Sequence, residues 1–258
     1  MNNFIWYNPT RILFGRGTHN EVGRETAAYS RRILLLYGGE SLKAAGTYGA
    51  ITKSLTEAGV EYRELGGVRP NPRLSLVHQG ILLCRREGLD FVLAAGGGSV
   101  IDTAKAIAAG VLYPGDVWDF YHTEKRPERV LPTGVVLTIP AAGSESSDGS
   151  VITREEENEK KSFCSPLLYP KFAILNPELC YTLPKRQIAA GSADILAHVM
   201  ERYFSPNGNT ELSDRLCEAA MKTIIHNAPL ALADPDRYEV WAELMWAGNV
   251  AHNGLLGK

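Results

Sequence analysis

The stretch FVLAAGGGSVIDTAKAIAAG, residues 91–110, decides the fold of this chain. It begins with a short apolar run over 91–95, which is typical of a strand buried on both faces. Three glycines and Ser99 follow, and the pattern then predicts a helix over 100–109. A strand, a glycine-rich turn and a helix in this order indicate one unit of a parallel α/β sheet.

The same alternation continues on both sides of this unit. Upstream, an apolar run over 33–37 precedes a predicted helix over about 43–58. A second cycle begins near Tyr62 and includes a predicted helix over 74–87, and 134–139 is a further apolar strand. We therefore predict an α/β fold with a Rossmann-like, mostly parallel sheet, in which ligands bind at the carboxyl ends of the strands.

Strand patterns end near Pro184, and helical patterns take their place. Three helices are predicted, over about 185–203, 210–227 and 236–255. Together they make a thin all-helical unit, which we expect to be incomplete.

This change of pattern predicts a domain boundary near residue 182. We expect a dinucleotide-binding α/β domain over 1–182 and the N-terminal part of a helical domain over 183–258. Within the first domain, the charged segment TREEENEKK, residues 153–161, is predicted to be an exposed loop.

Composition excludes several classes of protein. The chain has 258 residues, of which 45% are hydrophobic and 22% charged, so it can bury a core and is not a disordered chain. A net charge of −2 gives no electrostatic footprint for nucleic acid or an anionic membrane surface. The four cysteines form no C-x-x-C pair, and the first residues resemble neither a secretory leader nor a membrane span, so we expect a cytoplasmic protein with reduced thiols.

The glycine cluster at 96–98, with Ser99, is a candidate phosphate site. Glycines allow a close backbone approach, and the N-terminus of the following helix offers free N–H groups. Because Ile101 stands where G-x-G-x-x-G requires its third glycine, the ordinary dinucleotide fingerprint fails, and a tight turn without a ligand is the competing interpretation. Asp102, in the first turn of the helix, either complements the helix dipole or reaches a ribose or nicotinamide.

A second turn of this kind, Gly38-Gly39-Glu40-Ser41, follows the strand at 33–37. Considered separately it is equally well explained as a simple turn, but two such turns on one sheet suggest a dinucleotide. NAD-specific sites place a carboxylate on the ribose 2′-hydroxyl. Gly39 offers none and Ser41 can donate to a phosphate, which favours NADP(H) provided that the side chain of Glu40 points away.

Two further features have both a functional and a structural interpretation. The small-residue turn over 138–145 is either a plain loop or a surface that approaches a base or nicotinamide ring. Asp194 and His198 lie one helical turn apart on one face, where a carboxylate and an imidazole suit Fe²⁺ or Zn²⁺. An exposed helix pair has the same spacing, two ligands are too few for a catalytic site, and the other five histidines show no ligand spacing with this pair.

These clusters, in this order, resemble the iron-containing alcohol dehydrogenase family, in particular its NADPH-dependent butanol dehydrogenase and aldehyde reductase branch. The resemblance covers essentially the whole chain and rests on YGGES (37–41), RPNP (69–72), GGGSVIDTAKAIA (96–108), LTIPAAGSES (137–146), LLYPKFAILNP (167–177), YTLPKRQ (181–187) and AGSADILAHVMERY (190–203).

The resemblance implies a site for each cofactor in a cleft between a Rossmann-like and a helical domain. Gly38, Gly39 and Ser41 would hold the 2′-phosphate of NADP(H). Gly97, Gly98 and Ser99 would hold the pyrophosphate, with Asp102 near the nicotinamide. The other implied cofactor-lining residues are Asn71, Thr138, Ser147, Lys160 and Leu179, and the implied metal ligands are Asp194 and His198. Without the resemblance, Lys160 would be a solvated charge.

The sequence also departs from the family pattern. Ala142 stands where the family usually has Thr, Ser147 where this branch has Asn, and Glu40 where it has Gly. The family's other two metal ligands are histidines that follow the position of Lys258, and His252 matches neither. We therefore expect a C-terminally truncated member that lacks half of the ligand set.

The implied activity is hydride transfer between NADP(H) and a small alcohol or aldehyde, assisted by Fe²⁺ or Zn²⁺, with no protein nucleophile. With half a ligand set, we expect cofactor binding but weak turnover. Two alternatives stay open: a non-catalytic nucleotide-binding relic of the family, and an NAD-dependent enzyme similar to glycerol dehydrogenase. The resemblance also implies a possible homodimer, formed through an N-terminal hairpin edge at about 4–14.

Overall fold

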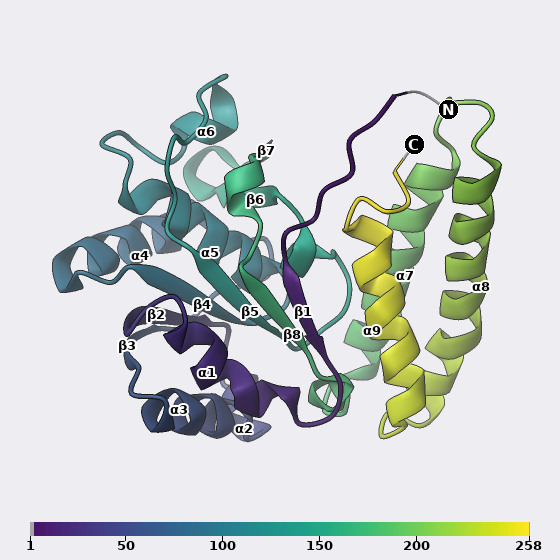
Figure 1. Ribbon diagram of the computed structural model, residues 1–258, viewed down its shortest axis with the longest axis horizontal. Coiled ribbons are helices and arrows are strands. Elements are labelled where there is room, and N and C mark those ends of the chain that lie inside the picture. Colours follow the sequence, from purple (N-terminus) through teal and green to yellow (C-terminus); the bar gives the residue numbers. More distant parts are fainter. Residues whose placement is uncertain (1–2, 258) are drawn as a thin grey trace.

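The computed structural model describes residues 3–257. Within that range six parallel strands form one sheet in the order β1-β8-β5-β4-β2-β3 (Figure 1). Their bounds are β1 Arg11–Phe14, β2 Arg32–Tyr37, β3 Glu61–Leu65, β4 Phe91–Gly96, β5 Thr133–Leu137 and β8 Phe172–Leu175. The predicted α/β fold with a Rossmann-like parallel sheet is confirmed.

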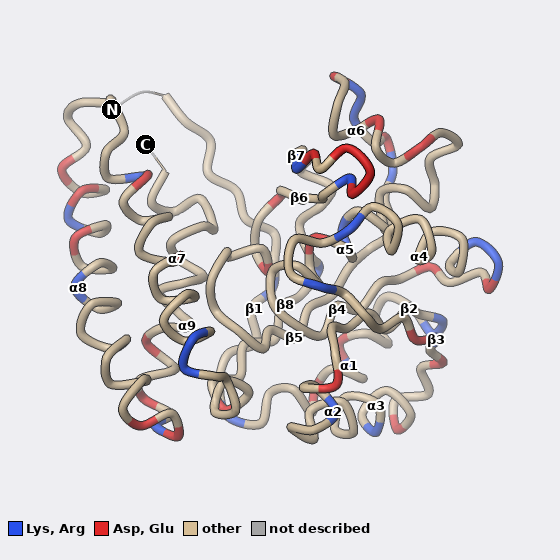
Figure 2. The backbone as a smooth tube through the Cα atoms, turned by 180° about the vertical axis from the view of Figure 1, so that it is seen from behind, with Lys and Arg blue, Asp and Glu red and all other residues tan. Residues whose placement is uncertain are grey.

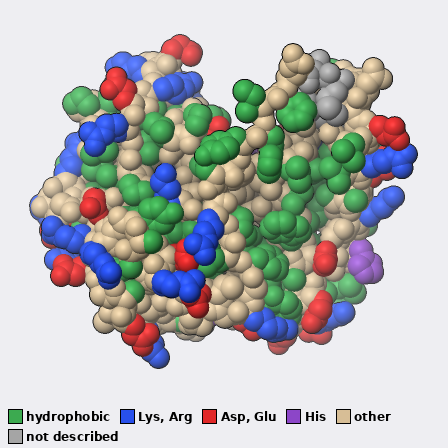
Figure 3. Space-filling view, in the orientation of Figure 1, with side chains coloured by type: hydrophobic (Ala, Val, Ile, Leu, Met, Phe, Trp, Pro, Cys, Tyr) green, Lys and Arg blue, Asp and Glu red, His purple; other side chains and the backbone are tan. Residues whose placement is uncertain are grey.

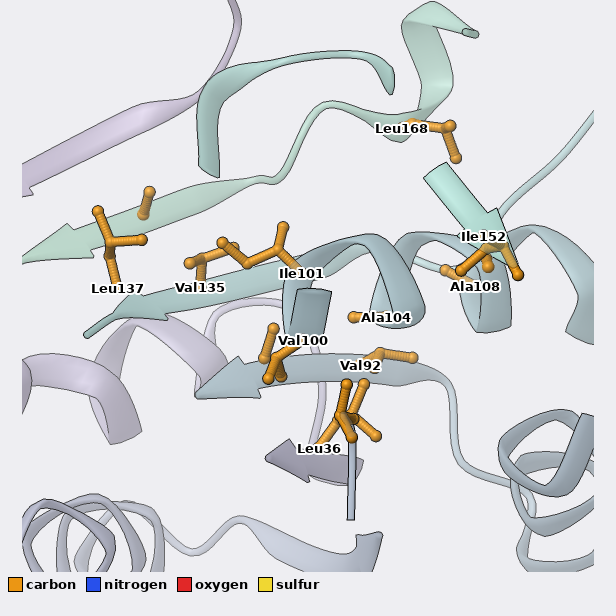
Figure 4. Packing of buried hydrophobic residues seen from close by; sticks show 14 of the residues in the cluster. Leu36, Val92, Val100, Ile101, Ala104, Ala108, Val135, Leu137, Ile152 and Leu168 are labelled. Atoms are coloured by element: carbon orange, nitrogen blue, oxygen red, sulfur yellow. The ribbon is translucent and has the colours of Figure 1, made fainter. Parts of the chain in front are cut away.

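Helices cover both faces of this sheet. Side chains alternate between the two faces along each strand, so each apolar strand contributes to a core on either side. Leu34 and Leu36 of β2 belong to a core cluster with α4 (Leu74–Glu87) and α5 (Gly98–Val111), part of which Figure 4 shows around Leu36 and Val92. Ile33 and Leu35 belong to the cluster on the other face, with α1 (Val22–Ala27) and α3 (Thr47–Glu57). Strands buried on both faces account for the continuous apolar runs of the sequence.

The chain changes direction across the sheet between β2 and β4. β3 lies on one side of β2 and β4 lies on the other, with Tyr37 paired to Ala95 in register. The turns that follow these two strands are therefore neighbours at the carboxyl edge of the sheet. Such a switch point is where open parallel sheets bind ligands.

The three predicted C-terminal helices are present. α7 (Lys185–Tyr203), α8 (Glu211–Ala233) and α9 (Tyr238–His252) pack against one another on the β1 side of the sheet (Figure 1). α8 runs beyond its predicted end at 227 and through Pro229, because buried residues on both sides of the proline keep the helix packed. The domain boundary near residue 182 stays a prediction.

Two predicted elements are wrong in detail. The helix predicted over 43–58 is divided into α2 (Ser41–Ala44) and α3, because Gly46 between them has φ 76°, which a continuous helix cannot contain. Segment 153–161 is not a loop. It belongs to an antiparallel hairpin of β6 (Gly149–Arg154) and β7 (Glu159–Cys164).

Charges alone do not make this segment a loop: the acidic residues gather at the turn between β6 and β7 (Figure 2), and Ile152 and Phe163 of the same hairpin are buried. Residues 4–14 do not form a hairpin within the chain, because over residues 3–257 β1 pairs only with β8, in parallel. A homodimer formed through this edge stays a prediction. No helix in the same range is long and apolar enough to cross a membrane.

Candidate functional site

A cavity of about 670 Å³ lies at the carboxyl ends of β2, β4 and β5 and extends to α7. Every predicted site residue except Ser147 lines it: Gly38, Gly39, Ser41, Asn71, Gly97, Gly98, Ser99, Asp102, Thr138, Lys160, Leu179, Asp194 and His198. Residues from seven separate parts of the sequence therefore share one hollow.

The turn between β4 and α5 is closely packed. A Cβ atom at Gly97 would lie 2.3 Å from Ile139 Cγ2, so the end of β4 can approach the segment after β5 only if this residue is glycine. α5 begins at Gly98 without a side-chain hydrogen bond at its N-cap, and Ser99 lines the cavity beside it. The partial positive charge and free N–H groups of such a helix N-terminus suit a phosphate.

The turn after β2 is open by contrast. A Cβ atom at Gly39 would meet nothing within 4 Å. The side chain of Glu40 is 84% exposed and its Oε1 lies 3.6 Å from Lys43 Nζ, so Glu40 points away from the cavity and does not line it. Gly39 and the following Ser41 therefore present backbone and a hydroxyl, without a carboxylate.

Two further chain segments that contact each other also line the cavity. Asn71 adopts φ 58°, a left-handed conformation that is uncommon outside glycine. Its Oδ1 accepts a hydrogen bond of 2.9 Å from Lys160 Nζ on β7. The backbone N–H of Thr153 on β6 donates to the carbonyl of Pro72 at 2.8 Å, which attaches the hairpin to the same segment. Lys160 is thus an exposed residue whose ammonium is held at the cavity by Asn71.

Asp102 faces the cavity from the first turns of α5. Its Oδ1 accepts from Ser144 Oγ at 2.6 Å, and its Oδ2 accepts from the Val151 N–H at 3.2 Å. Burial raises the pKa of this carboxyl group, and the neighbouring charge of Lys105 acts in the opposite direction. The carboxylate therefore joins α5 to the turn that follows β5 and to strand β6.

Lys105 is a residue that the sequence analysis missed. Its ammonium is fully buried and donates to the carbonyls of Ser144 (2.7 Å), Ser147 (2.8 Å) and Gly149 (3.0 Å). Burial lowers its pKa to about 8, against the raising effect of Asp102. The available signal was a single lysine within the apolar run 104–111 of this helix, a position where a charge is rare unless it is paired.

The remaining cofactor candidates divide into two groups. Thr138 and Leu179 line the cavity from the turns that follow β5 and β8. Ser147 does not line it: the residue is 7% exposed, and its Oγ lies 3.4 Å from Lys105 Nζ. Ser147 therefore lies behind the cavity wall and interacts with Lys105.

Asp194 and His198 line the cavity from α7. Nδ1 of His198 is buried without a hydrogen-bond partner, so this imidazole has an unused nitrogen. A carboxylate and a neutral imidazole are ligands that Fe²⁺ and Zn²⁺ accept. Over residues 3–257 no group of three or more His, Cys, Asp or Glu side chains is placed to hold a metal ion, so this pair fits two positions of a ligand set.

His252 lies beside this pair, although the sequence gives no spacing that would show it. Its ring centroid is 4.9 Å from that of His198, in an edge-on arrangement, and Arg202 Nη2 lies 3.0 Å from its Nδ1. Burial lowers the pKa of His252 to about 4, and the charge of Arg202 acts in the same direction. A neutral His252 therefore packs against the candidate ligand as a ring contact.

The sequence of this chain matches one known protein family over most of its length. Residues 9–177 match the family described as iron-containing alcohol dehydrogenase, and residues 188–256 match the C-terminal part of that family. The family resemblance predicted from the motifs is confirmed.

The relatives carry names from both cofactor classes. A probable NADH-dependent butanol dehydrogenase of Bacillus subtilis is 44% identical over 99% of this chain, and the NADPH-dependent aldehyde reductase YqhD of Escherichia coli is 40% identical over 100% of it. The chain spans 66% of the length of each. The crystal structure of an NADH-dependent butanol dehydrogenase from Thermotoga maritima matches with a TM-score of 0.96 at 42% identity, over 99% of this chain and 64% of that one.

Proposed function

We propose, because this chain belongs to the iron-containing alcohol dehydrogenase family, that its cavity binds a nicotinamide dinucleotide for the interconversion of primary alcohols and aldehydes. The observation that carries the proposal is the shared cavity. Two glycine turns at the switch point and the Asp194–His198 pair line the same hollow. A dinucleotide that extends from one turn across the other would end beside that pair.

We propose NADP(H) as the preferred cofactor. The turn after β2 offers Gly39 and Ser41, and the nearest carboxylate, Glu40, is turned toward Lys43. A site without a carboxylate does not repel a 2′-phosphate, whereas the carboxylate of NAD-specific sites does. Since the named relatives include both NADH-dependent and NADPH-dependent enzymes, the dissociation constants of NADPH and NADH must be measured side by side.

The chain's own residues would orient the reactants. The N-terminus of α5 holds the pyrophosphate, and Lys160 supplies a positive charge at the cavity wall. Asp194 and His198 would hold the metal ion, Fe²⁺ or Zn²⁺. When bound, the dinucleotide exchanges hydride with the substrate and the metal ion polarises the substrate oxygen. The described residues supply two ligands, so we propose measurable cofactor binding and weak turnover for this chain.

Two measurements test the proposal. Quenching or enhancement of NADPH fluorescence on titration with the chain measures cofactor binding, and NADPH oxidation with a short aldehyde and added Fe²⁺ or Zn²⁺ measures turnover. Asp194→Ala should abolish metal binding and leave the affinity for NADPH within about twofold, since a substitution outside a ligand's contacts has a small effect. Absence of binding by both NADPH and NADH would refute the proposal.

A non-catalytic nucleotide-binding function is the second candidate. It is favoured by the two-residue ligand set within residues 3–257. It predicts cofactor binding without metal binding, so a titration with Zn²⁺ of the wild type and Asp194→Ala separates the two candidates. An NAD-dependent activity similar to glycerol dehydrogenase would instead give tighter binding of NADH than of NADPH.

The N-terminal segment supports a homodimer as a further part of the proposal. Phe4, Ile5, Trp6 and Tyr7 are all more than half exposed, and hydrophobic side chains gather where this segment meets the neighbouring helices (Figure 3). Because β1 is an edge strand, a second copy has a surface to cover there. Sedimentation equilibrium of the wild type and of the double variant Ile5→Lys with Trp6→Lys tests the homodimer. A monomeric wild type would contradict it.

A further inference from the structure

A buried polar cluster joins the helical layer to the turn that follows β5. Asn249 of α9 is 1% exposed, and its Nδ2 donates to Glu145 Oε1 at 3.0 Å and to Ser146 Oγ at 2.7 Å. Glu145 is 2% exposed. Neither side chain lines the cavity, so neither is explained by contact with a cofactor or a metal ion.

The surfaces around this contact are packed so closely that small residues are required. A Cβ atom at Gly143 would lie 2.4 Å from His252 Cβ, and one at Gly191 would lie 2.8 Å from the carbonyl oxygen of Pro140. A Cβ atom at Gly248 would lie 3.1 Å from Ile195 Cδ1. These close contacts bring α7 and α9 against the turn that follows β5, and Asn249 adds buried side-chain hydrogen bonds to the same place.

We propose that Glu145 and Asn249 form a latch that fixes the seating of α7, α8 and α9 on the sheet. α9 packs directly on α7, which carries Asp194 and His198, so the latch sets the distance between that pair and the glycine turns. Glu145 and Asn249 are then positioning residues. The functional part of this inference rests on the proposed dinucleotide site, whereas the latch itself does not.

The charges around the latch support a structural role for the carboxyl group. The charge of Lys105 on α5 lowers the pKa of Glu145. Asp102 and Asp148 are the other carboxylates that interact with the same ammonium. Burial raises the pKa of Glu145. A carboxyl oxygen accepts a hydrogen bond from an amide in either protonation state, so the latch holds whichever state is present.

Distances between spin labels test the latch without any enzymatic readout. Cys164 is the exposed cysteine and the other three are buried, so labels are attached to cysteines placed at Lys53 of α3 and Lys222 of α8 in a Cys164→Ser background. The variants are Asn249→Leu, Asn249→Asp, and the exchange pair Glu145→Gln with Asn249→Asp. Asn227→Leu in α8 is the matched control, because its amide donates only to Thr223 of its own helix.

We expect Asn249→Leu and Asn249→Asp to broaden the distance distribution by about twofold, since each removes the amide donor of the latch. The exchange pair should restore the width, because the amide donor and the carboxylate acceptor change places. Equal widths in Asn249→Leu and Asn227→Leu would overturn the proposal. Should Asn249→Leu not fold, the exchange pair decides, and failure to recover the width of the wild type would count against the latch.

Cofactor affinity provides the second readout. We expect Asn249→Asp to weaken NADPH binding by about tenfold, because the fraction of molecules with a correctly seated cavity falls, and the exchange pair should recover it. Unchanged NADPH affinity in Asn249→Asp with a broadened distribution would overturn the link to the site. If the wild type binds neither NADPH nor NADH, the proposed function fails, and the label distances still decide the latch.

Discussion

Replacement of Lys105 by methionine isolates the contribution of one buried ammonium. Methionine is similar in length and apolar, so the change removes the charge and the donors and little volume. Three carbonyl oxygens at 2.7, 2.8 and 3.0 Å lose their donor, and Asp102 loses its neighbouring cation. We expect the segment between β5 and β6 to loosen, although no cavity is created.

The magnitude follows from two opposing effects. Each buried carbonyl without a donor costs about 1–3 kcal/mol. Against this, the buried ammonium carries a net penalty that methionine does not: burial outweighs the neighbouring carboxylates and lowers its pKa from 10.5 to about 8, which corresponds to about 3 kcal/mol. Loss of one partner from a buried ion pair has a net cost of about 3–5 kcal/mol, and we expect a loss within that range.

Urea denaturation followed by tryptophan fluorescence measures the loss. Lys53→Met is the matched control, because the side chain of Lys53 is 75% exposed and its replacement should change stability by no more than about 0.5 kcal/mol. A loss clearly below about 3 kcal/mol for Lys105→Met, the lower end of the expected range, would refute the assigned role.

Three other predictions follow from the same geometry. The pKa of Lys105 is lower in the folded chain than in the unfolded chain, so the unfolded chain binds more protons between pH 8 and 10.5. Over that window the free energy of unfolding of the wild type should rise by about 3 kcal/mol relative to that of Lys105→Met. A constant difference in urea midpoints would contradict this. A side chain at Gly39 would meet open space, so Gly39→Asp should change stability by less than about 0.5 kcal/mol. The new carboxylate should raise the Kd of NADPH at least about tenfold and leave the Kd of NADH unchanged. Equal effects on both cofactors would rule out a 2′-phosphate site here. Gly143→Ala places a Cβ atom 2.4 Å from His252 Cβ at φ 63° and should lose about 2–4 kcal/mol in urea denaturation, whereas near-wild-type stability would show that α9 is not seated on this turn.

Local patterns in the sequence predicted the elements near the site. The apolar runs at 33–37 and 91–95 each correspond to a strand, β2 and β4, because a strand buried on both faces is continuously apolar. Helix 74–87 was predicted with the bounds that α4 has, since Gly88 ends it with φ 62°. The spacing of Asp194 and His198 placed both on one face of one helix. Each of these signals depends on residues within a few positions of one another.

The tertiary structure decided which of these local elements meet. Lys160 reaches Asn71 across 89 positions of sequence, and Asn249 reaches Glu145 across 104. A charged run and a lone lysine carry no local signal of such partners, so the sequence does not predict the contacts of Lys160 or of Lys105.

The sequence by itself therefore determined the parallel α/β class, the two glycine turns and the candidate metal pair, because helix and strand periodicity and turn chemistry are local. Only the tertiary structure placed β4 beside β2, so that the two turns share one cavity, and turned Ser147 away from it toward Lys105. The physical reason is that strand order and the pairing of buried charges depend on contacts between distant segments. These contacts form only when the whole chain is packed.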